Sequence, residues 1–216
     1  MKKRNLLILF ALPLILSSCS LFGRKDNEEN KYEFSEQQFY DATNPTKIIL
    51  EANYKMDLYI EGDLYYTCEF DDGISKNTKY DLNGEISSRN MIQVESVNRG
   101  NFYAARYYNL DSGNTYDKTF SNENDLWSFF FPSEIMPLFF VNYEDAFYDA
   151  ELQVHRGYNF GVRYVSSYGQ VDDVYFTNYI LRGENGVPYS LEAEFGSIDI
   201  SIEISEHNNI SLPTLL

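Results

Sequence analysis

The chain has 216 residues, and hydrophobic residues make up 44% of them, which is enough for a folded core. Its 33 acidic residues outnumber its 17 basic ones, so the formal net charge is −16 at pH 7. Such a charge argues against nucleic-acid binding, which needs clustered Lys and Arg, and against lying flat on an anionic leaflet.

The N-terminal segment has the three parts of a secretory signal peptide. Lys2, Lys3 and Arg4 precede an apolar run over residues 6–16, and small residues follow it. The run is shorter than the roughly 20 residues that cross a bilayer as a helix. The segment therefore predicts export followed by cleavage.

The cleavage region, Leu16-Ser17-Ser18-Cys19, resembles the lipobox of bacterial lipoproteins. The resemblance implies that residues 1–18 are removed and that Cys19 carries a diacylglyceryl thioether. Residues 19–32 would then be the lipidated Cys and a flexible tether. The protein would be held at the cell membrane, on its extracytoplasmic face, through this lipid. The alternative is an ordinary signal peptide that happens to have a Cys nearby.

The second cysteine, Cys68, has no partner within the chain if Cys19 is lipidated. It alternates with Leu64, Tyr66 and Phe70, so a buried, inert thiol is predicted.

The first half of the predicted domain begins with a helix and continues as strands. Ser35 and Gln38 fit a capping box for a helix that runs to about Ala42, and Asn44-Pro45 would end it. From Thr46 onward the apolar residues repeat every second position, which is typical of half-buried strands. Turn signals at Gly62-Asp63, Asp72-Gly73 and Asn83-Gly84 separate the predicted strands, which cover residues 54–60, 64–70, 79–82, 85–97 and 102–110.

Residues 126–140 interrupt this alternation and are the most apolar stretch outside the signal peptide. Ser121 or Asn122 can cap a helix at their start, while Pro132 and Pro137 prevent one continuous helix. We expect two short helical pieces buried against the sheet.

The second half returns to alternating strands before an irregular, Pro-containing tail over residues 207–216. The predicted strands cover residues 146–154, 159–166, 171–182, 187–195 and 198–205. Two histidines, His155 and His207, are predicted to lie at the surface.

This order of elements predicts an α+β fold over residues 33–216. It would be one highly curved antiparallel sheet of about nine or ten strands, with helices on its concave face and water on its convex face. The order resembles that of the half-barrel lipoprotein carriers (LolA- and LppX-like proteins): a lipobox, a tether, a first helix, a long meander, a helical plug and a final hairpin. The resemblance implies a hydrophobic ligand cavity and assigns no residue to it.

Sequence motifs for catalysis are absent. The chain has no Gly-rich phosphate loop, no Cys-x-x-Cys, no His-x-x-x-His and no Gly-x-Ser-x-Gly. We therefore expect a non-enzymatic binding or interaction domain with no cofactor and no metal. The alternative function is a carrier of an apolar ligand, such as a lipid or a lipoprotein, and a less favoured one is an extracytoplasmic hydrolase.

If a ligand binds, it is expected to be apolar and to contact Trp127, Phe130, Phe131 or Phe139, because residues 126–140 must either plug the sheet or line a pocket. A second set of rings could form an exposed aromatic platform: Tyr65, Tyr66, Tyr103, Tyr107 and Tyr108. Strand alternation puts adjacent residues such as Tyr107 and Tyr108 on opposite faces, and packing accounts for most of these rings without a ligand.

Overall fold

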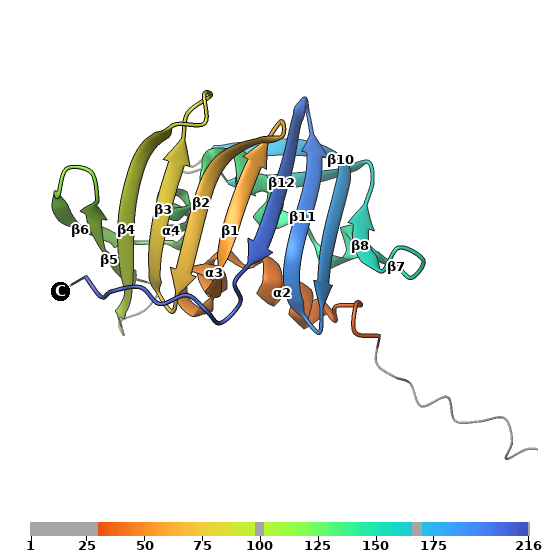
Figure 1. Cartoon of the computed structure of the whole chain (residues 1–216). Coiled ribbons are helices and arrows are strands. Elements are labelled where there is room, and N and C mark those ends of the chain that lie inside the picture. The colour runs from red at the N-terminus through yellow and green to blue at the C-terminus, as the bar shows by residue number, and fades with distance from the viewer. Residues whose placement is uncertain (1–29, 98–101, 166–169, 216) are drawn as a thin grey trace, which may run out of the picture. The chain divides into compact units, whose positions relative to one another are not determined.

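The computed structural model describes residues 30–97, 102–165 and 170–215. The predicted signal peptide, Cys19 and most of the predicted tether lie outside these residues. Residues Tyr32–Leu216 form one compact unit. It is built on a single antiparallel sheet of 12 strands with a few short helices (Figure 1), which confirms the α+β class.

The chain runs through the elements in this order: α2 (Glu36–Thr43), α3 (Pro45–Glu51), β1 (Asn53–Ile60), β2 (Asp63–Asp71), β3 (Ile74–Tyr80), β4 (Ile86–Val97), β5 (Phe102–Asn109), β6 (Thr115–Phe120), α4 (Glu123–Phe130), the 3-10 helices η1 (Ser133–Phe140) and η2 (Tyr143–Asp145), β7 (Phe147–Asp149), β8 (Val154–Gly157), β9 (Phe160–Val165), β10 (Val171–Glu184), β11 (Val187–Phe195) and β12 (Ile198–Ser205). The spatial order of strands is β6-β5-β4-β3-β2-β1-β12-β11-β10-β8-β7, and β9 also pairs with β10.

The first and last strands are neighbours in the middle of the sheet, because β1 pairs with both β2 and β12. Met56 and Leu58 of β1 lie opposite Ile204 and Ile202 of β12. The predicted alternation holds on these strands: Leu58 and Ile202 are buried in the core, while the residues on either side of each along its own strand are more exposed. One face of the sheet therefore supplies the core.

The N-terminal helices confirm one prediction and correct another. The Ser35 hydroxyl accepts the Gln38 N–H, and the Gln38 side chain accepts the Ser35 N–H, as the capping box predicts. The expected strand pattern from Thr46 is wrong at its start, because Pro45 opens a second helix, α3. Asn44 caps α3 by accepting the Lys47 N–H at 3.1 Å. The N–H of the first helical residue has no partner within the helix, so proline, which lacks an N–H, loses no hydrogen bond there. Its fixed φ also matches that of a helix.

Residues 123–140 form two short helical pieces, as predicted. Asn122 is the cap residue of α4 and accepts the Asp125 N–H at 2.9 Å. Pro132 precedes η1, and Pro137 lies inside it. The Phe131 ring between the two pieces packs against Phe70 of β2 at a centroid distance of 6.1 Å. No helix of the described residues is long and apolar enough to cross a membrane.

The predicted single strand over residues 146–154 is wrong, because the chain folds there into a tight hairpin. The Asp149 carboxylate accepts the N–H groups of Glu151 and Leu152 at 2.9 and 3.1 Å. An Asp side chain that bonds backbone two and three residues ahead stabilises a turn. Two short strands, β7 and β8, replace the expected one, and β6 also adds to the predicted number of strands.

His155 is buried, with 1% of its surface exposed, so the prediction of a surface histidine is wrong. Its Nδ1 bonds the Ala146 carbonyl at 3.0 Å, and its Nε2 accepts the backbone N–H of Phe34 at 2.8 Å. Tyr143 donates its hydroxyl to the Phe34 carbonyl at 3.1 Å. The Phe34 ring lies where a side chain at Gly183 would be. Phe34 is thus an anchor where the chain enters the unit.

We predict that His155 makes the stability of the fold depend on pH. Burial lowers its pKa below the ordinary 6.5, and protonation would set a donor at Nε2 against the Phe34 N–H. Between the lowered pKa and 6.5 the unfolded chain binds more protons than the folded chain. The contribution of His155 to the free energy of unfolding is therefore complete above about pH 6.5 and is lost as the pH falls below it.

Urea unfolding of the full chain at about pH 7.5 and about pH 5.5 measures this contribution. His155→Gln retains His207 and every carboxylate, so the variant should lose less stability on acidification than the wild type. Equal losses in the two proteins would show that His155 does not titrate in this way.

Candidate functional site

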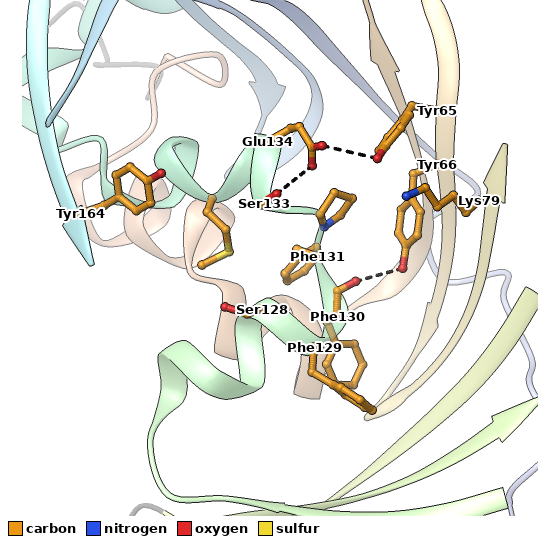
Figure 2. Close-up of a pocket in the computed structure, with 12 residues that line it drawn as sticks. Tyr65, Tyr66, Lys79, Ser128, Phe129, Phe130, Phe131, Ser133, Glu134 and Tyr164 are labelled. Atoms are coloured by element: carbon orange, nitrogen blue, oxygen red, sulfur yellow. Dashed lines mark hydrogen bonds between the residues drawn. The ribbon is translucent and has the colours of Figure 1, made fainter. Parts of the chain in front are cut away.

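A pocket of about 450 Å³ lies between the sheet and the segment that joins α4 to η1. Tyr65 and Tyr66 of β2 and Lys79 of β3 line it from the sheet. Residues 128–134 and Met136 line it from the helical segment, and Tyr164 of β9 closes another side (Figure 2). Its volume lies within the range of about 300–1,000 Å³ that is usual for small-molecule sites.

A β-bulge brings two adjacent tyrosines to this pocket. Leu58 pairs with Tyr66, but Tyr59 pairs with Leu64, so Tyr65 has no partner in the register of β1. The extra residue breaks the alternation of side chains, and Tyr65 and Tyr66 both line the pocket. Strand alternation alone would have put one of them on the other face.

Tyr66 ties the helical segment to the sheet. Its ring is buried, and its hydroxyl donates to the Phe130 carbonyl at 2.9 Å (Figure 2). Phe130 is the last residue of α4, so this carbonyl has no partner within the helix. Burial raises the pKa of Tyr66 well above its ordinary value, which keeps the hydroxyl protonated as a donor.

The pocket also has polar groups. The Tyr65 hydroxyl bonds Glu134 at 3.4 Å, and the Ser133 hydroxyl bonds the other oxygen of Glu134 at 3.2 Å (Figure 2). The Lys79 ammonium lies 5.0 Å from the centroid of the Tyr65 ring. No carboxylate of the described residues forms an ion pair with Lys79. A lysine that forms no ion pair among the described residues is thus found with a carboxylate and several aromatic rings in one hollow.

The structure places the four predicted ligand contacts in two groups. Phe130 and Phe131 line the pocket, although each is at most 3% exposed. Trp127 and Phe139 do not line it. The Trp127 indole N–H donates to the Thr46 hydroxyl at 2.9 Å, and Phe139 packs on Phe131 at 4.9 Å. Trp127 thus joins the helical segment to α3, and Phe139 packs within the helical segment.

Sequence reasoning missed Lys79, Glu134 and Tyr164 as pocket residues. Tyr65 had a signal as one of the clustered tyrosines, but its role depends on the bulge. Lys79 and Tyr164 lie on strands that are far apart in the chain, and only the folded sheet brings them to one hollow. A contact map between strands would have been needed to find them.

Cys68 is fully buried, as predicted. Its thiol donates to Asn77 Oδ1 at 2.7 Å, and Asn77 in turn bonds Ser75 and Asn90. Burial raises the pKa of the thiol well above its ordinary value, so the reactive thiolate is disfavoured. Among residues 30–97, 102–165 and 170–215, no group of three or more His, Cys, Asp or Glu side chains is arranged to hold a metal ion.

Comparison of the sequence with protein-family models and with curated protein sequences gave no match. The features of this chain that bear on its function are therefore the geometry of the pocket and the N-terminal sequence.

We predict that Tyr66→Phe lowers the free energy of unfolding by about 1–3 kcal/mol, because it leaves the Phe130 carbonyl buried without a donor. Urea unfolding followed by far-UV circular dichroism measures the change. Tyr175→Phe is the matched control: this ring is 56% exposed, and its variant should stay within about 0.5 kcal/mol of the wild type. Equal effects of the two substitutions would show that the Tyr66 hydroxyl does not stabilise the fold through this hydrogen bond.

Proposed function

We propose that this chain is a lipid-anchored extracytoplasmic binding protein that carries a ligand with an apolar body in the pocket between its sheet and its helical segment. The observation that carries the proposal is the pocket of about 450 Å³, which is lined by Phe and Tyr rings and has Lys79 and Glu134 among its polar groups. Small-molecule sites commonly combine aromatic side chains with a few placed polar groups, and this pocket has both.

The shape that we propose for the sheet is a half-barrel with α4 and η1 on its concave face. Two features support it. Strands twist with one hand, and this twist accumulates over a sheet of many strands. One face of this sheet carries core residues of β1, β2, β4 and β12 and contacts the helical segment through Tyr66 and Phe70. A sheet that curls toward that face brings distant strands such as β2 and β9 to the same pocket.

Binding is favoured over hydrolysis by the chemistry of the pocket. Neither histidine of the chain nor Cys68 lines it. Its two serines bond other groups: the Ser128 hydroxyl donates to the Asn124 carbonyl, and the Ser133 hydroxyl donates to Glu134. The base that most often activates a serine is histidine, and the pocket lining has none: Ser133 bonds only the carboxylate of its neighbour Glu134, which Tyr65 also bonds.

The polar groups suggest an amphiphile rather than a pure hydrocarbon. A ligand that buries an apolar body against the partly exposed Phe129, Pro132 and Tyr164 can place a polar end near Lys79 or Glu134. The Lys79 ammonium forms no ion pair with a carboxylate of the described residues, so the anionic end of a ligand can pair with it, at the cost of part of the hydration of this exposed side chain. We therefore propose a ligand with an apolar chain and a polar, preferably anionic, end.

The anchoring part of the proposal predicts that Cys19→Ala abolishes lipid labelling. Cells grown with a radiolabelled fatty acid should label the wild-type chain and not the variant, and the variant should leave the membrane fraction or keep residues 1–18. A single acyl chain gives only marginal membrane binding, so stable anchoring requires the two or more chains of a lipoprotein. Cys68→Ala is the control and should label like the wild type. A labelled Cys19→Ala chain would contradict the lipobox assignment.

The ligand part of the proposal predicts that filling the pocket blocks binding. The anisotropy of a dansyl-labelled fatty acid, titrated with the full chain, should report saturable binding. Ser133→Trp, at the edge of the pocket, should weaken that binding about tenfold, which corresponds to about 1.4 kcal/mol. Ser112→Trp, in the exposed turn between β5 and β6, should leave it unchanged.

The charge of Lys79 is tested in the same titration. Lys79→Met should weaken binding a few-fold, whereas Lys76→Met is the matched control, because Lys76 lies on the same strand but is paired with Glu69. If the probe does not bind the wild type, or binds Ser133→Trp equally well, the pocket is not a ligand site.

A further inference from the structure

The pocket between the sheet and the helical segment has one charge of each sign in its lining, Lys79 and Glu134. Lys79 lies on β3 and Glu134 lies on η1, so the two charges come from different walls of the pocket (Figure 2). They form no ion pair with each other or with any other charged side chain of the described residues. The pocket therefore holds two opposite charges that remain separate.

The side chain of Tyr65 is in contact with both charges. The Lys79 ammonium lies 5.0 Å from the centroid of the Tyr65 ring, and the Tyr65 hydroxyl donates to one oxygen of Glu134 at 3.4 Å. The cation is thus near the ring of this side chain, and the carboxylate is at its hydroxyl. A polar group that spans this one tyrosine can therefore pair with both charges.

Glu134 can still accept hydrogen bonds from a cation. An ionised carboxylate has about four lone-pair sites, and the Tyr65 and Ser133 hydroxyls use one each, at 3.4 and 3.2 Å. Both distances exceed the usual range of about 2.5–3.0 Å for a hydroxyl donor. Because both donors are neutral, they leave the charge of the carboxylate unpaired. A positively charged donor therefore finds free acceptor sites on Glu134.

The kind of cation follows from what Tyr65 already contacts. A quaternary ammonium has no N–H and is bound mainly by aromatic faces. The Tyr65 ring beside Glu134 already has the Lys79 ammonium over it, and a second cation on this ring is repelled by the first. A primary ammonium has N–H donors and can bond the Glu134 carboxylate directly. The site thus favours a primary ammonium over a quaternary one.

We infer that the ligand of this pocket is an amphiphile whose polar end has both a primary ammonium and an anionic group, as in a phosphoethanolamine lipid. The ammonium binds Glu134, the anionic group binds Lys79, and the apolar body lies on the exposed parts of Phe129, Pro132 and Tyr164. This inference rests on the proposed function and goes beyond it, because an anionic end alone uses Lys79 and leaves Glu134 unpaired. A polar end with both charges also has no net charge, which lowers its repulsion from a chain with a net charge of −16.

Competition among headgroups tests the inference. The full chain with bound dansyl-labelled fatty acid is titrated, below the micellar concentration, with lysophospholipids that share one acyl chain and carry phosphoethanolamine, phosphocholine or phosphoglycerol. The phosphoethanolamine lipid should displace the probe at a concentration about fivefold lower than the other two, as expected of a charge-assisted hydrogen bond at a partly exposed site. Glycerophosphoethanolamine, which is the same headgroup without an acyl chain, should not displace the probe in this range.

Glu134→Gln removes the charge but keeps an acceptor for the Tyr65 hydroxyl. This variant should lose the preference for phosphoethanolamine and should still bind the fatty-acid probe. Glu144→Gln is the matched control and should keep the preference, because Glu144 is exposed on η2 and does not line the pocket. Lys79→Met should weaken the binding of all the lysophospholipids by the same factor, since each has a phosphate.

Equal displacement by the three headgroups in the wild type would overturn the inference and leave the carrier function standing, and this comparison requires no variant. A preference that persists in Glu134→Gln would overturn it as well, because another group would then select the ammonium. Displacement of the probe by glycerophosphoethanolamine would overturn the assignment to a lipid, since the pocket would bind the free polar compound. A probe that does not bind the wild type at all would instead contradict the proposed function, and the inference with it.

Discussion

The need to bury one face of a single open sheet is the constraint on which the rest of the structure depends. Alternating strands such as β1 and β12 place Leu58 and Ile202 on that face, and an antiparallel sheet with one apolar face must be covered by another element. Residues 123–140 provide much of this cover. Tyr66 fastens the cover to the sheet at the Phe130 carbonyl, and Trp127 fastens it to α3 through Thr46.

The same cover explains why a pocket exists at this place. Pro132 and Pro137 prevent a continuous helix from lying along the sheet, so the chain covers the apolar face in two pieces with a break between them. The bulge in β2 turns both Tyr65 and Tyr66 toward this break, and Glu134 lies beside it. A segmented cover over a bulged strand leaves a hollow with both rings and charges, which is the combination that an amphiphilic ligand requires.

The two ends of the compact unit are held by different kinds of contact. Near its start, Phe34 is buried, and its backbone is bonded on both sides by His155 and Tyr143. Near its end, the chain lies on the outer face and is held mainly by side chains that bind backbone. The first contact depends on a particular ring in a closed site. The second depends mainly on an extended backbone, which side chains of β1, β2 and β4 bind.

Periodicity and capping chemistry by themselves determined the elements whose signals are local. They include the capping box at Ser35, the two helical pieces after Asn122, the alternating strand at Ile198–Ser205 and the burial of Cys68. The tertiary structure alone decided the helix at Pro45, the hairpin at Asp149, the burial of His155 and the pairing of Tyr65 with Lys79. The physical reason is that alternation states which residues of a strand share a face. Which strands become neighbours, where a register slips and which loop covers a face depend on contacts between residues far apart in the chain.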